Sequence, residues 1–151
     1  DEPQIKEEKK VKKAVLKKEG IKTGLKSVDK ETAIRAAGQL LCDLGFTDEA
    51  YIQAMVAREN MVSTYMGMGV AIPHGTSDAK EDVKKTGIVV MQYPEGVDFG
   101  EEKAYLIIGI AGVGDEHLEI LGNIVASLED EELLENLKKD ADIDTIIKTF
   151  G

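Results

Sequence analysis

Cysteine is nearly absent from this sequence, because Cys42 is the only one in 151 residues. An internal disulfide is therefore excluded, which fits a reducing compartment. Long apolar runs are also missing, since the longest, Ala104–Val113, is far shorter than the roughly 20 residues of a membrane-spanning helix. No apolar stretch behind a charged start marks an export signal. We therefore expect a cytoplasmic protein that does not insert directly into a membrane.

Basic residues are in deficit. The chain has 19 Lys and Arg against 29 Asp and Glu, a net charge of −10, which argues against nucleic acid or an anionic membrane as the main partner. Residues 1–20 depart from this balance, because seven lysines against five acidic residues give +2 there and leave −12 for residues 21–151. With few apolar residues, residues 1–20 are expected to be a charged linker, the alternative being a partner-binding arm. Residues 21–151 are expected to form a single domain.

Several familiar catalytic motifs are missing as well. The glycines at 67 and 69 are not followed by the Gly-Lys-Ser/Thr of a phosphate-binding loop, and no Gly-x-Ser-x-Gly elbow of a serine hydrolase is present. The two histidines, His74 and His117, have no cysteine or close cluster of carboxylates beside them, which makes a poor zinc site. We expect neither a metal nor a cofactor.

Apolar spacing indicates the fold. Asp29 and Thr47 are the expected N-caps of the first two helices, and Gly45 is expected to end the first of them. The expected helices cover residues 30–44, 48–59, 77–84, 117–128, 131–139 and 142–150, and the expected strands cover residues 21–25, 70–73, 86–93 and 104–112, with a turn at 94–96. The strand at 104–112 is apolar almost throughout, as expected when helices cover both faces of a sheet. This order predicts an α/β domain with a mixed β-sheet flanked by helices on both faces.

The residues at the end of the strand at 70–73 are the strongest candidates for a reactive site. Pro73 fixes φ and cannot donate to a strand ladder, so the strand should end there and present His74 at its carboxyl end. Gly75 lets the backbone pass close to whatever the imidazole holds. Thr76 or the next residue can cap the following helix, whose free N–H groups would form an anion site. A nucleophilic imidazole beside an anion site is what a transient phosphohistidine needs.

Two further side chains are site candidates. His117 opens the helix after the second central strand, and open α/β sheets place their sites beyond the carboxyl ends of strands. The alternative for both histidines is a role in the core. Arg58 ends a helix among small and apolar neighbours, where its guanidinium can hold phosphate oxygens. The alternative for Arg58 is a solvated surface charge.

Several segments together resemble one family, in order and from about Ile21 to the C-terminus. These segments are Ala57-Arg58-Glu59, Thr64-Tyr65-Met66-Gly67, Val70-Ala71-Ile72-Pro73-His74-Gly75-Thr76, Gln92-Tyr93-Pro94-Glu95-Gly96-Val97, Phe99-Gly100-Glu101-Glu102 and Glu116-His117. They are similar to the enzyme IIA component of the bacterial phosphoenolpyruvate-dependent sugar phosphotransferase system, in the mannitol/fructose class. The segments at 92–97 and 99–102 resemble the mannitol branch most.

The resemblance implies a phosphoryl relay by a phosphotransferase. The family's phospho-accepting histidine falls on His74, with the phosphate on Nε2, its active-site arginine on Arg58 and its second active-site histidine on His117. Phosphate contacts are implied for Gly75, Thr76 and Thr64. The donor would be the phosphocarrier protein HPr, and the acceptor a cysteine on the IIB domain of a mannitol or fructose permease.

Two other classes of function stay open at this point. One is a regulatory IIA-like module, nitrogen-related or from a transcription regulator, that acts by phosphorylation-dependent binding. The other is a small-ligand binding domain without chemistry. For the relay, apolar residues near the histidine loop are expected to supply part of the docking surface, among them Met66, Met68, Ala71 and Ile72.

Overall fold

The computed structural model describes residues 16–140 and 142–151, so residues 1–15 of the predicted linker lie outside the described residues. Leu16 already packs against the core, and Lys18–Gly20 forms a short 3-10 turn, η1, in which Gly20 is buried. The described chain therefore joins the folded body before Ile21, where the sequence predicted its start.

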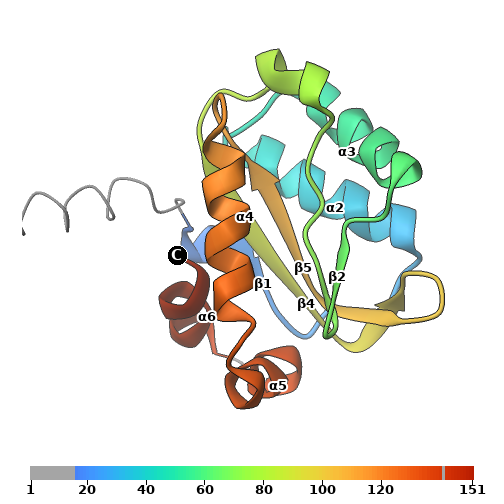
Figure 1. The fold of residues 1–151 in the computed structure, drawn as a ribbon, viewed down its shortest axis with the longest axis vertical. Helices are drawn as coiled ribbons and strands as arrows, with labels where there is room; N and C mark the ends of the chain where they lie inside the picture. The colour runs from blue at the N-terminus through green and yellow to red at the C-terminus, as the bar shows by residue number, and fades with distance from the viewer. Residues whose placement is uncertain (1–15, 141) are drawn as a thin grey trace, which may run out of the picture.

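Within the described residues, five strands form one sheet in the order β1-β4-β5-β3-β2 (Figure 1). The strands are β1 (Ile21–Lys22), β2 (Tyr65–Gly67), β3 (Val70–Ala71), β4 (Gly87–Asp98) and β5 (Lys103–Ala111). The central pair, β4 and β5, is antiparallel, whereas β1 runs parallel to β4, β3 parallel to β5, and β2 antiparallel to β3. The mixed sheet expected from the sequence is confirmed.

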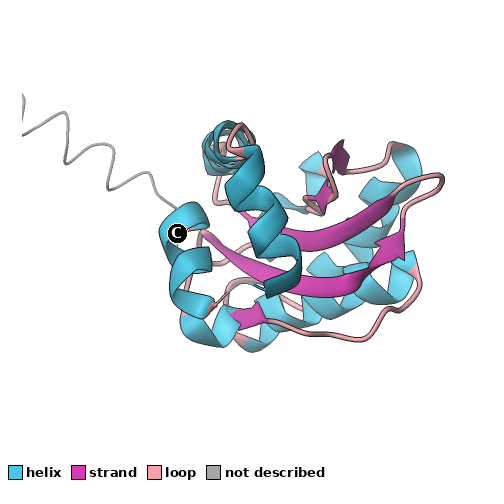
Figure 2. Ribbon diagram, turned by 90° about the horizontal axis from the view of Figure 1, so that it is seen from below, coloured by secondary structure: helices cyan, strands magenta, loops and turns pink. Residues whose placement is uncertain are grey.

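Helices cover both faces of this sheet, as Figure 2 shows. One face packs against α2 (Lys30–Asp43) and α3 (Ala50–Met61), and the other against α4 (Glu116–Ser127), α5 (Glu131–Asp140) and α6 (Ile143–Phe150). Side chains alternate along β4, so that Val89 and Met91 join the first core while Ile88 and Val90 join the second. A sheet buried on both faces explains why its central strands are apolar almost throughout.

The helix limits follow their predicted signals in most places. Asp29 caps α2 by accepting a hydrogen bond from the backbone N–H of Thr32 at 3.2 Å, and Asp142 caps α6 in the same way through Thr145 at 2.7 Å. Gly45 ends α2 with a positive φ of +85°, a conformation that glycine adopts without a steric penalty.

Three local predictions were wrong. Thr47 does not cap α3, whose N-cap position is Glu49. Thr47 is buried, and its hydroxyl has no hydrogen-bond partner among the described residues. The expected turn at 94–96 lies inside β4, which continues to Asp98 through an irregularity in its pairing with β5. The helix expected at 77–84 is a 3-10 segment, η2 (Ser77–Asp82), interrupted by non-helical backbone at Ala79.

The sheet order brings the two histidine segments together. β3 and β5 are neighbours and run parallel, so their carboxyl ends lie at the same edge of the sheet. His74 extends this pairing through an isolated parallel bridge to Ile110, and the N–H of Ile110 donates to the carbonyl of Pro73 at 3.0 Å. The loop after β5 leads directly into α4, which carries His117 in its first turn. None of the helices described for this chain has the length and apolar character to cross a membrane.

Candidate active site

The two ring nitrogens of His74 are in different environments. Nδ1 lies 2.8 Å from the carbonyl oxygen of Ile72. A carbonyl oxygen only accepts hydrogen bonds, so Nδ1 carries the hydrogen and Nε2 keeps its lone pair. The loop therefore presents a nucleophilic nitrogen on the ring.

Burial lowers the pKa of His74, and although the hydrogen bond to Ile72 opposes this effect, the charges of Arg58 and His117 lower the pKa further. The lowered pKa leaves the imidazole neutral at neutral pH. A neutral ring is the form that can attack an electrophile, since protonation would occupy the Nε2 lone pair.

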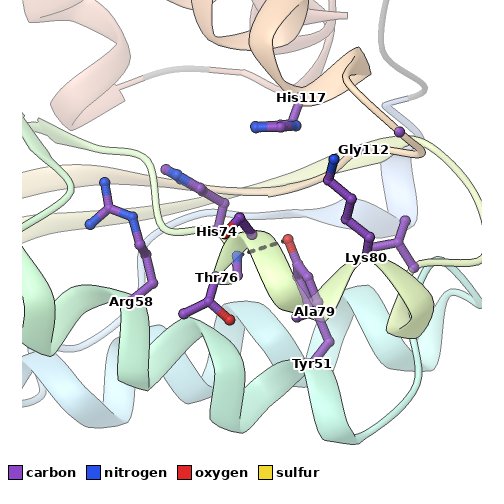
Figure 3. Close-up of a pocket in the computed structure, with 12 residues that line it drawn as sticks. Tyr51, Arg58, His74, Thr76, Ala79, Lys80, Gly112 and His117 are labelled. Atoms are coloured by element: carbon purple, nitrogen blue, oxygen red, sulfur yellow. Dashed lines mark hydrogen bonds between the residues drawn. The ribbon is translucent and has the colours of Figure 1, made fainter.

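His117 faces His74 from the first turn of α4. The two ring centroids are 6.2 Å apart and the ring planes are inclined by 32° (Figure 3). Gly112 makes this approach possible, because a Cβ at that position would lie 2.4 Å from the backbone nitrogen of His117. Any larger residue would push α4 away from the end of β5.

Arg58 reaches the same site from the last turn of α3. One guanidinium nitrogen, Nη1, donates to the carbonyl oxygen of Val62 at 2.6 Å, which also closes the end of the helix. The rest of the guanidinium faces the cavity beside His74 (Figure 3). The sequence prediction that Arg58, His74 and His117 share one site agrees with this geometry.

These side chains line a cavity of about 140 Å³. One water molecule occupies roughly 30 Å³ in the liquid, so the cavity has room for a phosphoryl group. Its remaining lining comes from α3, from η2 with its flanking loops, and from the loop between β5 and α4, namely Tyr51, Gly75, Thr76, Ser77, Ala79, Lys80, Val83, Gly112 and Gly114. The cavity thus lies at the carboxyl ends of β3 and β5.

Tyr51 is a site residue that the sequence analysis missed. Its hydroxyl donates to the carbonyl of Ile110 at 2.8 Å and accepts from the N–H of Gly75 at 2.9 Å. It therefore ties the residue after His74 to strand β5. Burial raises the pKa of Tyr51 to about 12, so the hydroxyl remains neutral and able to donate. In the sequence, Tyr51 is one residue of the helix expected at 48–59, and no local motif marks it as part of a site.

Gly75 and Thr76 line the cavity, but in a way that differs from the prediction. The N–H of Gly75 is occupied by Tyr51, and a Cβ at Gly75 would lie 2.5 Å from Cε1 of that ring. Thr76 donates its hydroxyl to Asp78 at 2.5 Å and makes no side-chain cap. Because η2 is a short 3-10 segment, the predicted α-helix start, on which the expected anion site depended, was wrong.

Thr64 is not part of the cavity lining. Its backbone N–H and hydroxyl both donate to the buried carboxylate of Glu59, at 2.9 and 2.6 Å. Burial alone would raise the pKa of Glu59, but the hydrogen bonds from Ser63 and Thr64 and the charge of Lys30 outweigh it and hold the pKa below its usual value. The geometry therefore does not support phosphate binding by Thr64.

The expected docking residues need a similar correction. Ala71 and Ile72 are buried, so they offer no surface. Met66 and Met68 are exposed, but they precede β3, whereas His74 follows its carboxyl end. The exposed apolar residues that neighbour the site residues in sequence are instead Met61 and Val62, after Arg58, and Val113 and Leu118, on either side of His117.

Chemically, the site combines a neutral imidazole nucleophile with cationic and hydrogen-bonding side chains around an open cavity. No group of three or more His, Cys, Asp or Glu side chains within residues 16–140 and 142–151 is arranged to hold a metal ion. Nucleophilic attack by Nε2 on a phosphoryl group requires positioning and charge stabilisation, which these residues can supply.

Comparison with known proteins identifies a family. Residues 14–151 match the family model described as the phosphoenolpyruvate-dependent sugar phosphotransferase system, EIIA 2. The chain is 46% identical over 138 residues to the mannitol-specific phosphotransferase enzyme IIA component of Geobacillus stearothermophilus, covering 91% of this chain and 95% of that protein.

Larger proteins and a solved structure are also similar. The chain is 45% identical over 137 residues to the mannitol-specific EIICBA component of Pasteurella multocida (strain Pm70), which covers 88% of this chain but only 22% of that protein. The chain thus spans about a fifth of the length of such relatives. The structure of the mannitol enzyme IIA of Escherichia coli, solved in complex with phosphorylated mannitol enzyme IIB, superposes with a TM-score of 0.84 at 41% identity, covering 90% of this chain and 98% of that one.

Proposed function

Since this chain belongs to the EIIA 2 family of the phosphoenolpyruvate-dependent sugar phosphotransferase system, we propose that it accepts a phosphoryl group on His74 and passes it to a cysteine of a permease IIB domain. The donor is the phosphorylated carrier protein HPr. The permease is specific for mannitol, as the names of the similar enzyme IIA proteins suggest. Both transfers take place in the cytoplasm.

One observation carries this proposal. Nδ1 of His74 is tied to the carbonyl of Ile72, which leaves the Nε2 lone pair free in a cavity that Arg58 and His117 also line. A histidine with the opposite tautomer would point its lone pair at a carbonyl oxygen and could not accept a phosphoryl group at Nε2.

The first transfer forms a bond between Nε2 of His74 and phosphorus. The nitrogen–phosphorus bond of the donor phosphohistidine breaks, and its electron pair returns to the donor imidazole. The His74 ring then carries the phosphoryl group on Nε2 and a proton on Nδ1, which the carbonyl of Ile72 keeps hydrogen-bonded. No proton has to be removed before attack, because the pKa of His74 is already lowered by burial.

The second transfer reverses this chemistry. A cysteine thiolate of the IIB domain attacks phosphorus, the bond between phosphorus and Nε2 breaks, and the electron pair returns to the ring of His74. Because Nδ1 keeps its proton, His74 leaves as a neutral imidazole, which is a better leaving group than an anionic one. The same hydrogen bond to Ile72 therefore assists both steps.

Arg58 and His117 act on the phosphoryl oxygens. The guanidinium of Arg58 can bind two oxygens in one plane, which neutralises charge and fixes orientation. His117 can donate a hydrogen bond to an oxygen in either protonation state, so its role is orientation and stabilisation rather than acceptance.

Both partners must dock over the same cavity. Four exposed apolar residues, Met61, Val62, Val113 and Leu118, lie within four positions of Arg58 or His117 in the sequence, and we refer to these four as the apolar rim. A methionine in such a rim adapts to two partners of different shape.

The test is onward transfer. The phosphorylated protein is mixed with purified IIB domains of a mannitol and of a fructose permease, and phosphate on each IIB cysteine is followed by mass spectrometry. Faster transfer to the mannitol domain is expected. Faster transfer to the fructose domain would overturn the proposed sugar, and transfer to neither would favour the regulatory alternative.

A further inference from the structure

Lys80 is a charged side chain of the cavity that the mechanism above does not use. It lies on η2 and lines the cavity together with Arg58, His74 and His117. In Figure 3, His74 lies between Arg58 and Lys80, and the lysine side chain extends from η2 toward the side of the cavity where His117 and Gly112 lie. Two cationic side chains thus flank the imidazole.

The backbone that carries Lys80 is held firmly. Ala79 is buried beneath it, and η2 is tied at its far end by a hydrogen bond from the N–H of Asp48 to the carbonyl of Asp82 at 2.8 Å. The carbonyl of Lys80 itself accepts from the N–H of Val83 at 3.2 Å. The side chain can therefore move while its attachment point stays fixed relative to His74.

The ammonium of Lys80 has only a weak partner in this structure. Its Nζ lies 3.6 Å from Oδ1 of Asp115, and the two side chains are 52% and 82% exposed. An ion pair between two exposed side chains contributes little to stability, so a more highly charged anion in the cavity would displace the carboxylate. Asp115 stands at the N-cap of α4 but makes no side-chain cap hydrogen bond, so its carboxylate is not required there.

A phosphoryl group would be such an anion. It brings a charge of about −1.5 to −2 near neutral pH. Arg58 supplies one positive charge, and one of its donors, Nη1, is already bonded to the carbonyl of Val62. A further cation would place more positive charge beside the phosphoryl oxygens, and a lysine binds phosphate well as a point charge.

We propose that Lys80 is a second phosphate-binding cation, which leaves Asp115 and contacts the phosphoryl oxygens when His74 is phosphorylated. This inference rests on the proposed function of the site. On phosphorylation, Lys80 thus exchanges the carboxylate of Asp115 for the phosphoryl oxygens, and Asp115 is left without this ion pair.

The test compares Lys80→Gln, Lys80→Arg and a matched control, Lys84→Gln. Lys84 is also exposed, is also paired with a carboxylate, that of Asp48 at 3.0 Å, and does not line the cavity. We expect Lys80→Gln to slow phosphorylation of His74 by HPr about 10-fold, Lys80→Arg to restore most of the rate, and Lys84→Gln to behave as the wild type.

A second readout needs no partner protein. In phosphorus NMR titrations of the phosphorylated proteins, the pKa of the phosphoryl group should be higher in Lys80→Gln than in the wild type, because a neighbouring cation stabilises the dianion. Asp115→Asn, which removes the competing carboxylate, should not raise this pKa. An effect of Lys80 on the docking of HPr cannot change this pKa, because HPr is absent from the titration.

Three results separate the outcomes. Equal phosphoryl pKa values in wild type and Lys80→Gln would overturn the role of Lys80, even if the rates differ. Equal slowing by Lys84→Gln would also overturn it, since the effect would then be a general one of surface charge. A wild-type protein that takes no phosphate on His74 would instead reject the proposed function on which this inference rests.

Discussion

At His74, one hydrogen bond and the burial of the ring decide what the side chain can do. The carbonyl of Ile72 assigns the hydrogen to Nδ1, and burial with the nearby charge of Arg58 lowers the pKa of the ring. Neither effect alone would leave the Nε2 lone pair free at neutral pH. A buried ring without the carbonyl could place its hydrogen on Nε2, and an exposed ring with the carbonyl would be partly protonated at neutral pH.

The pKa of His74 can be measured directly. NMR titration of the ring should give a pKa below the ordinary value of about 6.5, so the nucleophile is present at pH 7 and is lost as the pH falls through the lowered pKa. Burial remains in Arg58→Gln but the guanidinium charge is gone, so the pKa should rise toward the ordinary value while staying below it. A wild-type pKa above 6.5 would contradict this account of the site.

Arg58 should matter more for transfer than for folding. Arg58→Gln should fold normally and transfer phosphate about 100-fold more slowly, judging by the loss of single preorganised donors in other enzymes. Arg58→Lys should recover only part of the rate, because an ammonium cannot bind two oxygens in a plane. Rates are measured with phosphorylated HPr, with thermal unfolding as the control. An unchanged rate in Arg58→Gln would return Arg58 to the role of a surface charge.

At the scale of helices and strands, the hydroxyl of Tyr51 fixes the position of the loop that carries His74. Tyr51 connects α3, on which it lies, to β5 through Ile110 and to the loop through Gly75. With the hydrogen bond from Ile110 to Pro73, the backbone on both sides of His74 is tied to the same strand.

Tyr51→Phe removes the hydroxyl and leaves the N–H of Gly75 and the carbonyl of Ile110 without this partner. We expect a loss of about 1–3 kcal/mol in the free energy of unfolding and transfer about 10-fold slower. Tyr93→Phe is the matched control, because Tyr93 is buried in β4 and does not line the cavity. If denaturant unfolding and transfer assays gave equal effects for both variants, Tyr51 would have no special role in holding the loop.

The sequence predicted most elements because their signals are local. Asp29 and Gly45 marked both ends of α2, and the apolar runs marked the central strands. The predictions of an N-cap at Thr47 and of a turn at 94–96 were wrong for the same reason, because contacts distant in sequence set both local structures. Thr47 is buried by its neighbours, and the pairing of β4 with β5 resumes at Val97 after the irregularity. Local preference gave way to tertiary contacts in each case.

The site could be predicted in part. His74 and His117 follow two strands that prove to be parallel neighbours, so the rule about carboxyl ends of strands brought them together correctly. Tyr51 and Lys80 were missed for different reasons. Tyr51 reaches the cavity from α3, far from His74 in sequence. Lys80 follows His74 closely, but it lies on a segment predicted as an α-helix that is in fact a 3-10 segment. Thr64 was placed at the site by resemblance, but its hydroxyl is occupied by Glu59.

The molecule as a whole carries a net charge of −10, whereas the four side chains of the apolar rim are uncharged and exposed. A largely acidic chain discourages non-specific association, so we expect exposed apolar residues that neighbour the site residues in sequence to supply affinity for a protein partner. Leu118 is the rim residue that lies on α4, and it is 59% exposed.

Leu118→Glu should therefore weaken docking without changing the chemistry. We expect a rise of about 10-fold in the KM for phosphorylated HPr, in line with the loss of one buried apolar side chain. Val125→Glu is the control, since Val125 is also exposed on α4 but lies two turns away from the start of the helix. A similar rise in the KM for Val125→Glu would place the docking surface elsewhere on the molecule.

The identity of the phosphorylated atom is the point on which the whole account depends. The protein is incubated with phosphoenolpyruvate, enzyme I and HPr, and the phosphate is located by mass spectrometry and by NMR of the imidazole rings. We expect a single acid-labile phosphate on Nε2 of His74, and none on a His74→Gln protein that folds normally. Phosphate on His117, or stoichiometric phosphorylation of His74→Gln, would contradict the account.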